Sequence, residues 1–183
     1  MSDTWIWSDL HLGHTNILRY CNRPFKDTEE MDKALFRAWR ETVKGSDTII
    51  NLGDFCFKWS KERLQNVILN LPGHKILILG NHDRHHSVEW WREVGFDEVY
   101  PYPIIYKRWY ILSHEDVFLN EKMPYINIHG HRHNVKLASP CYINVSVECT
   151  GYRPVLLSSL LPSEEPNIPE EEMWVPVKEG LNE

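Results

Sequence analysis

The first half of the chain alternates short apolar runs with amphipathic stretches, and this order constrains the fold more than any other feature. The apolar runs at 4–9, 47–54 and 75–81 have the length and composition of strands. Between the first two, apolar residues at helical spacing predict a helix over 28–43, with Asp27 as its N-cap. Strands and helices in this alternation favour a largely parallel sheet in an α/β fold.

Two shorter helices are predicted in the same way. Ser60 has N-cap chemistry and precedes an apolar stripe that Pro72-Gly73 stops. Ser87 opens another helix, which we expect to end near Gly95.

After residue 95 the helix signals stop and strand-like runs follow one another. These runs are VYPYPIIY, WYILSH, YINIHGH and CYINVSVE, and we expect hairpins to join them. Units of strand and helix followed by a series of strands indicate two sheets packed together, with helices outside. We expect one domain over 1–161 and a separate tail over 162–183, which holds seven acidic residues and one lysine.

Polar side chains that can bind a metal stand just past the ends of the apolar runs. They are Asp9, His11, Asp54, Asn81, His114, His131 and His133. In open α/β sheets, ligands bind at the carboxyl ends of the strands. A shared position of this kind predicts that these side chains meet in one site.

The alternating histidines of NIHGHRH (127–133) fit the polar face of a surface strand, but the other candidates favour a metal site. Imidazole and carboxylate suit manganese, iron, zinc or nickel, of which we prefer manganese, and the lack of thiolates argues against a closed structural zinc site. Gly130 would let the backbone turn close to the site. His129 is left over, and we expect a structural or supporting role for it. We assign Asp9, His11, Asp54 and His133 to one cation, and Asp54, Asn81, His114 and His131 to a second, with Asp54 bridging.

The charge of such a centre suits an anionic substrate. Two dications bring four positive charges, and two carboxylates with one bridging hydroxide remove three, so the centre keeps about +1. This surplus attracts a phosphate oxygen, and the bridging water, made acidic by both metals, would be the nucleophile.

The blocks D-x-H, GD, GNHD, a later isolated histidine and GHxH occur in this order within residues 5–148, and together they resemble the calcineurin-like metallophosphoesterase superfamily. The resemblance implies a four-layer α/β/β/α sandwich of two mixed sheets flanked by helices, and the same metal ligands. It also implies that His82 stabilises the phosphoryl transition state or protonates the leaving oxygen, while Asp83 orients His82 or balances its charge. The flanking stretches SDLHLGHTNILRYCNRPF and NVSVECTGYRPV resemble a small group of bacterial and phage predicted phosphoesterases.

Four further residues are candidates for binding the substrate. Arg23 and Arg84 have guanidinium groups that can grip a phosphate through two hydrogen bonds, although a surface salt bridge is the alternative for each. His14 and Asn16 follow the first ligands closely and either line the pocket or belong to an ordinary loop.

The expected function is metal-dependent hydrolysis of phosphate esters, with a preference for small or nucleotide-type phosphodiesters. In the resembling Ser/Thr phosphatases a D-R-G element follows the GD block, whereas this chain has GDFCFKW with no such arginine. A phosphomonoesterase or a nuclease would use the same centre. A scaffold that has kept the fold without the activity is the remaining alternative.

Composition limits the partners and the location. The sequence holds no apolar run of the roughly 18–20 residues that span a bilayer. Outside the tail, basic and acidic residues are equal in number, which argues against a long nucleic acid as partner. The four cysteines have no paired spacing, so we expect reduced thiols and a cytoplasmic protein. The sequence does not indicate an oligomeric state.

Overall fold

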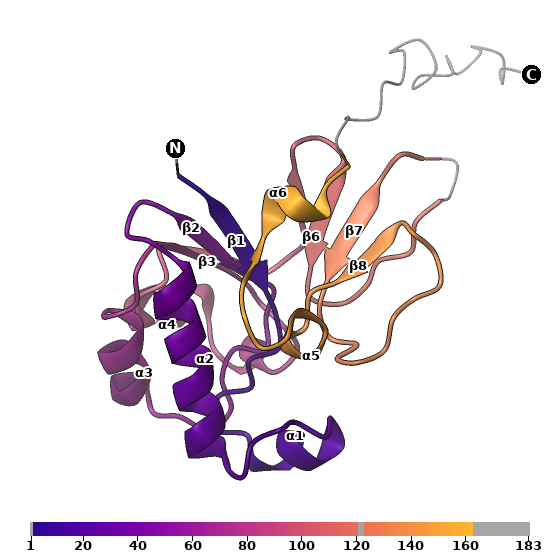
Figure 1. Ribbon diagram of the computed structural model, residues 1–183. Helices are drawn as coiled ribbons and strands as arrows, with labels where there is room; N and C mark the ends of the chain where they lie inside the picture. Colours follow the sequence, from indigo (N-terminus) through magenta and orange to yellow (C-terminus); the bar gives the residue numbers. More distant parts are fainter. Residues whose placement is uncertain (1, 121–122, 163–183) are drawn as a thin grey trace, which may run out of the picture.

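The computed structural model describes residues 2–120 and 123–162, in which the chain forms two packed sheets (Figure 1). The larger sheet has the order β4-β3-β2-β1-β9, with β1 to β4 parallel and β9 antiparallel to β1. Its strands are β1 (Thr4–Trp7), β2 (Thr48–Asn51), β3 (His74–Ile78), β4 (Glu98–Tyr100) and β9 (Val155–Leu156). The parallel arrangement predicted for the first half of the chain is therefore confirmed.

The second sheet has the order β5-β6-β7-β8 and corrects the expectation of hairpins. Only β5 and β6 form an antiparallel pair, whereas β6, β7 and β8 run parallel. Parallel neighbours need a long crossover, and residues 114–125 and 130–141 supply one after β6 and after β7. The strands are β5 (Ile104–Tyr106), β6 (Tyr110–Ser113), β7 (Ile126–His129) and β8 (Tyr142–Asn144).

The three predicted helices form, and each begins at the expected cap. The side chains of Asp27, Ser60 and Ser87 accept hydrogen bonds from backbone N–H groups of α2 (Thr28–Thr42), α3 (Lys61–Ile68) and α4 (Val88–Val94). Gly95 ends α4 with a φ of 121°, a conformation that favours glycine.

Several short elements were not predicted. The segment after Asp9 forms α1 (Thr15–Tyr20), and the run CYINVSVE leaves the sheet after β8 to form α5 (Val147–Thr150). The others are the 3-10 turn η1 (Asp83–His85) and α6 (Leu157–Leu160). No helix among residues 2–120 and 123–162 has the length and apolarity needed to cross a membrane. The acidic tail expected over 162–183 lies, beyond its first residue, outside the described residues.

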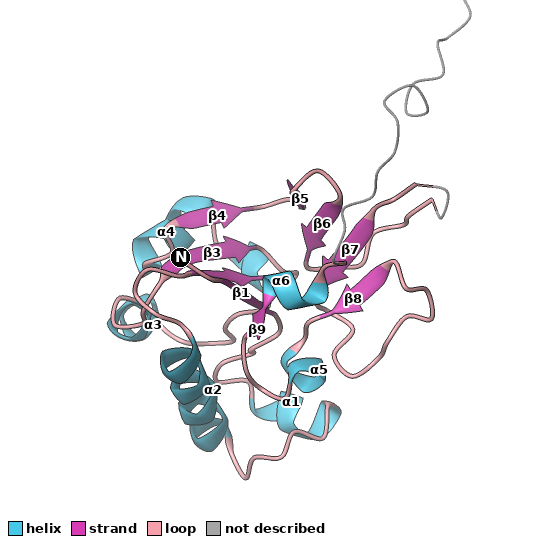
Figure 2. Ribbon diagram, turned by 45° about the horizontal axis from the view of Figure 1, so that its top comes forward, coloured by secondary structure: helices cyan, strands magenta, loops and turns pink. Residues whose placement is uncertain are grey.

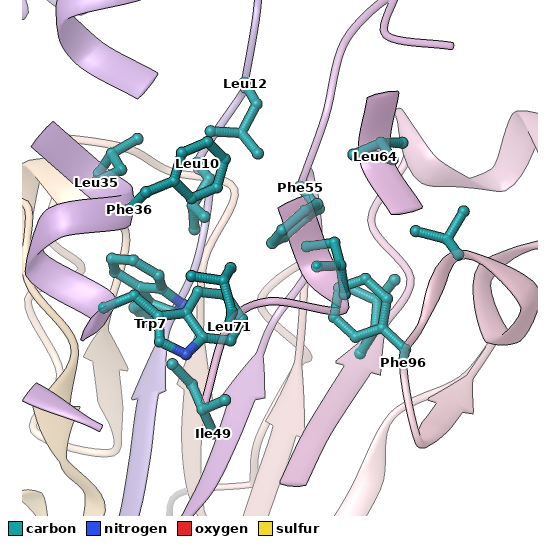
Figure 3. Packing of buried hydrophobic residues seen from close by; sticks show 14 of the residues in the cluster. Trp7, Leu10, Leu12, Leu35, Phe36, Ile49, Phe55, Leu64, Leu71 and Phe96 are labelled. Atoms are coloured by element: carbon teal, nitrogen blue, oxygen red, sulfur yellow. The ribbon is translucent and has the colours of Figure 1, made fainter. Parts of the chain in front are cut away.

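The core has two layers because the central strands are buried on both faces. Ile6 and Ile50 face the second sheet and pack with Leu112 and Ile128. The side chains of neighbouring positions, such as Trp7 and Ile49, point the other way and pack in the cluster under the helices (Figure 3). Helices α2, α3 and α4 cover this face of the larger sheet (Figure 2). This alternation follows from the period of two in a strand. The result is two mixed sheets flanked by helices, as expected.

Candidate metal centre

Four side chains converge where the chain leaves β1, β2 and β7, and we call them the inner site: Asp9, His11, His133 and the Oδ2 atom of Asp54. The Nε2 atom of His11 lies 3.8 Å from Asp9 Oδ1 and 3.5 Å from Asp54 Oδ2. The Nε2 atom of His133 lies 3.9 Å from the same Asp9 oxygen. These separations between ligand atoms suit one cation between them, and Asp9, His11 and His133 form a group able to hold one.

The outer site lies on the other side of Asp54 and consists of Asn81, His114, His131 and the Oδ1 atom of Asp54. His114 Nε2 is 3.4 Å from Asp54 Oδ1 and 3.0 Å from Asn81 Oδ1. His131 Nδ1 is 3.2 Å from the same His114 nitrogen. Asp54, His114 and His131 are a second group able to hold a cation. The structure thus brings all seven predicted ligands close together around Asp54.

The backbone at the ligands is strained. Of the ten non-glycine residues with positive φ among the described residues, five are candidate ligands: Asp9, His11, Asp54, His131 and His133. Such conformations cost energy for residues with a Cβ atom and cluster at functional sites. These backbone conformations occur at both sites. They direct the side chains of the candidate ligands toward the centre at a cost in local stability.

Two glycines let the loops approach one another. A Cβ atom on Gly130 would lie 2.0 Å from Ser8 Oγ and 2.4 Å from Asp9 Oδ2. A Cβ atom on Gly80 would lie 2.2 Å from Asp54 Oδ1. Any side chain at either position would therefore push a ligand carboxylate away, as expected for Gly130.

Two buried donor atoms at the inner site lack, among residues 2–120 and 123–162, a partner that a bound cation would provide. Asp9 Oδ1 and His11 Nε2 are buried and, within the described part of the chain, have no hydrogen-bond partner. Buried polar atoms without a partner are costly. Both atoms point to the place where a cation at the inner site would satisfy them.

The electrostatics of the centre agree with this fit. Burial opposes ionisation of Asp9, but the neighbouring rings of His11, His114 and His133 hold the pKa of Asp9 below its ordinary value. Burial also disfavours a charged His114, yet its hydrogen bond to Asp54 and the charges of Asp9 and Asp54 raise its pKa to about 9. The carboxylates therefore create a negative field that attracts positive charge.

Other groups fix which nitrogen each histidine presents. His133 Nδ1 donates to Glu148 Oε1 at 3.0 Å, and His114 Nδ1 donates to the Leu52 carbonyl at 2.7 Å. Both rings are left with Nε2 facing the centre. Partners of this kind are typical of metal-bound histidines.

His14 supports His11 in a similar way. Their Nδ1 atoms are 3.1 Å apart, so His11 can donate there and keep its Nε2 lone pair for a cation. Burial and the neighbouring His11 lower the pKa of His14 to about 4, so its ring is neutral and can accept. His14 also stacks on Phe57, with ring centroids 4.1 Å apart.

Arg23 is not placed to bind substrate, which corrects the expectation for this residue. Its side chain is fully buried and donates to the carbonyls of Asp9 and Leu10 and to Glu148 Oε1. The guanidinium thus holds the loop after β1 and the carboxylate behind His133. Glu148 was not predicted as a site residue, because an acid well separated in sequence from GHRH carries no local signal of its contact with His133.

Asp83 also has a different partner from the one expected. Its carboxylate is buried and accepts the backbone N–H groups of Asp54, Phe55 and Gly80 at 2.7, 3.0 and 2.9 Å. Burial and the nearby Asp54 raise the pKa of Asp83 to about 7. Asp83 therefore positions the loop that carries Asp54, rather than orienting the ring of His82.

His82 stands at the solvent side of the centre. Its Nε2 is 3.9 Å from Asp54 Oδ2, and its backbone N–H donates to Asp54 Oδ1 at 2.9 Å. About a third of its side chain is exposed, unlike that of His11. Its ring can therefore reach a substrate bound at the centre.

The remaining candidates lie further out or are buried. Arg84 makes a two-fold contact with the exposed Glu115, at 3.1 and 2.9 Å, which is the surface salt bridge considered as its alternative. Asn16 is an exposed residue of α1. His129 is buried on β7, where its Nδ1 contacts the Gly130 carbonyl oxygen at 2.8 Å, in keeping with a structural or supporting role.

Comparisons with known proteins identify the family of the chain. A profile of the calcineurin-like phosphoesterases matches residues 3–167. The uncharacterized protein MJ1445 of Methanocaldococcus jannaschii is 32% identical over 171 residues, which cover 88% of this chain and 90% of that protein. The Gene 66 protein of Mycobacterium phage L5 is 41% identical over 90 residues, which cover 48% of this chain and 43% of the phage protein.

One solved structure extends the likeness to the fold. The crystal structure of AQ665, a protein of unknown function from Aquifex aeolicus, matches with a TM-score of 0.69 and 26% sequence identity. The match covers 87% of this chain and 98% of that one. The resemblance seen in the motif blocks is confirmed over nearly the whole described chain. The chain therefore belongs to the calcineurin-like phosphoesterase family.

Proposed function

We propose that this protein is a phosphodiesterase that uses two divalent cations, one at the inner site and one at the outer site. The observation that carries the proposal is the position of Asp54 between two ligand sets. Its two oxygens lie 3.5 Å from His11 Nε2 and 3.4 Å from His114 Nε2. A shared carboxylate of this kind is typical of paired metals about 3.5–4 Å apart, which act in displacement at phosphorus.

The bound cations would supply a Lewis acid for the phosphate oxygens and lower the pKa of water at the centre. The chain's own residues do the rest. Asp9 and Asp54 set the charge of the centre, and the histidines hold the cations without cancelling their charge. His82 lies next to Asp54, within reach of a substrate bound at the centre. It would donate a proton to the oxygen of the departing alcohol.

The segment after Asp54 supports diesters over monoesters. The position next to Asp54 is Phe55, which is fully buried and packs edge-on against Trp91 and Phe96. No arginine stands there to neutralise the second charge of a monoester. A diester carries one negative charge, which matches the single surplus charge of the centre.

We further propose manganese as the metal and the cytoplasm as the location. Imidazole, carboxylate and amide oxygen suit Mn²⁺, while Fe, Zn and Ni remain candidates for the same donors. All four cysteines are free thiols, as a reducing compartment would keep them.

The test is hydrolysis of bis-p-nitrophenyl phosphate and p-nitrophenyl phosphate by metal-stripped protein, with Mn, Ni, Zn or Mg restored singly. We expect diester turnover that needs a metal and is lost in Asp54→Asn. Asp97→Asn is a matched control, because Asp97 lies near the start of β3, where it accepts from the Lys75 backbone. Turnover of the monoester alone would contradict the diester preference, and a digested single-stranded oligonucleotide would favour a nuclease. Two bound metals without turnover of any ester would favour the inactive scaffold.

A further inference from the structure

A cavity of about 290 Å³ opens beside His82 and is lined largely by aromatic rings. We call it the aromatic cavity and define it by His82, Phe57, Lys58, Trp59, His86 and Trp90. Its volume is close to the lower end of the roughly 300–1,000 Å³ of small-molecule sites. A single planar group with a sugar fits this size, and a folded polymer does not.

The rings come from the segment after β2 and from the segment after β3, where Trp90 lies on α4, and both segments also carry residues of the metal centre. Phe57 and Trp59 follow β2 and Asp54, whereas His86 and Trp90 follow β3 and His82. The ring of Phe57 meets that of His82 edge-on, with centroids 5.5 Å apart. The aromatic cavity is therefore directly joined to the residue that faces the departing alcohol.

The walls are held in place before any ligand arrives. His86 stacks on Trp90 with centroids 3.8 Å apart and an interplanar angle of 7°. The guanidinium carbon of Arg63 lies 3.8 Å from the ring centroid of Trp59. Gly13 makes room for this ring, since a Cβ atom there would lie 2.4 Å from Trp59 Nε1. Pre-ordered flat walls lower the cost of binding a flat ligand.

The charge of the lining also selects among ligands. Of the described residues that line the cavity, none is acidic, Lys58 is a cation, and His85 joins His82 and His86 in the lining. Aromatic faces stack on nucleobases of any identity. The ammonium group of Lys58 favours a group that enters with a phosphate attached.

Resting on the proposed phosphodiesterase activity, we propose that the aromatic cavity binds the base of a departing nucleoside. The substrate class is then a short nucleotide diester. An oxygen of water forms the new bond to phosphorus, the bond to the nucleoside oxygen breaks, and His82 gives that oxygen its proton. The products are a phosphate monoester and a nucleoside, and the proton lost by water restores His82 through solvent.

Two diesters with the same phosphoryl part and different departing alcohols test this. They are the dinucleotide TpT, which releases thymidine, and the methyl ester of thymidine 3′-phosphate, which releases methanol. We expect kcat/KM to be about tenfold higher for TpT, the size of one stacking contact. Trp90→Leu should bring the ratio of the two values toward one, and Tyr102→Leu, at an exposed aromatic outside the cavity, should leave it unchanged. Equal values in the unmodified protein would overturn the proposal.

A second measurement follows binding of a nucleotide to the cavity and does not depend on catalysis. In the Asp54→Asn protein, thymidine 5′-phosphate, whose base lies on the departing side of the phosphate, should quench tryptophan fluorescence, and Trp90→Leu in the same background should weaken the quenching. If neither diester is hydrolysed with any metal, the proposed phosphodiesterase fails, and quenching alone then decides whether the cavity binds a base. Absence of quenching at millimolar nucleotide would overturn the base-binding proposal.

Discussion

The inner and outer sites share Asp54 but differ in their surroundings. At the inner site Asp9 and His11 are buried, with 0% and 2% of their surface exposed. At the outer site Asn81 and His131 are exposed, whereas His114 and the shared Asp54 are buried. The inner histidines are also held by side chains, His14 and Glu148, whereas His114 is held by a backbone carbonyl.

If both proposed cations bind, this difference in surroundings predicts firm binding at the inner site and weaker binding at the outer site. The inner donors are fixed and desolvated before a cation arrives, so little freedom is lost on binding. The outer donors must be ordered by the cation and remain open to water. We therefore expect the inner cation to bind more tightly and the outer one to exchange with solvent.

The largest effect is expected for Asp9→Asn, which removes a charged ligand from the inner site. Loss of a supporting partner alone costs about 10–100-fold in metal affinity or activity, so loss of the ligand should exceed that range. Metal analysis after gel filtration should find the inner cation missing, and diester turnover should fall more than about 100-fold. Full activity with normal metal content would break the assignment of the inner site.

Glu148→Gln should have the next largest effect and should act on the inner site only. The amide cannot accept from His133 and Arg23 as the carboxylate does, so the ring of His133 is less firmly held. We expect inner-site affinity to fall by about 10–100-fold, with outer-site affinity unchanged, in calorimetric titrations. Glu115→Gln, at an exposed acid paired with Arg84, is the matched control. Equal weakening of both sites would contradict the division.

That the candidate ligands lie together could be predicted from the sequence, because their positions follow from local patterns. Each of Asp9, Asp54 and Asn81 comes just after a buried run whose end can be read from hydrophobicity. Parallel strands then bring these ends to one edge. Helices α2, α3 and α4 could likewise be predicted from local patterns, namely their N-cap residues and the helical spacing of their apolar residues.

The errors arose where long-range contacts decide. Nothing within YINIHGH shows that β7 pairs in parallel with β6 rather than through a hairpin, since pairing depends on the path of residues 114–125. Arg23 has a guanidinium group that could bind a phosphate. Only the burial of this group against Glu148 shows that its role is structural. The family resemblance led us to expect that Asp83 serves His82, yet the partners of its carboxylate are backbone groups of another loop.

A smaller effect is expected for Asn81→Ala, which tests the difference between the two sites by weakening the outer site alone. The variant removes a neutral, exposed ligand 3.0 Å from His114 Nε2. We expect the outer cation to bind about tenfold more weakly, so that turnover recovers at higher Mn²⁺, while the inner cation remains. Activity that cannot be restored by metal would show a role for Asn81 beyond ligation.

The smallest effect is expected for Arg84→Ala, at the exposed edge beyond the outer site. Its partner Glu115 is also exposed, and surface ion pairs of this kind contribute less than about 1 kcal/mol to stability. Urea unfolding should show a change within that limit, with little change in kcat/KM. A large rise in KM without a loss of stability would return Arg84 to the substrate site.

The central claim is that one chain holds two cations bridged by Asp54, and a manganese titration followed by electron paramagnetic resonance tests it most directly. The first equivalent should give the spectrum of an isolated ion at the inner site. The second should reduce that signal, because two ions about 3.5–4 Å apart couple magnetically. In Asp54→Asn this coupling should be absent. A signal that rises to saturation at one equivalent, or two uncoupled ions in the unmodified protein, would contradict the account.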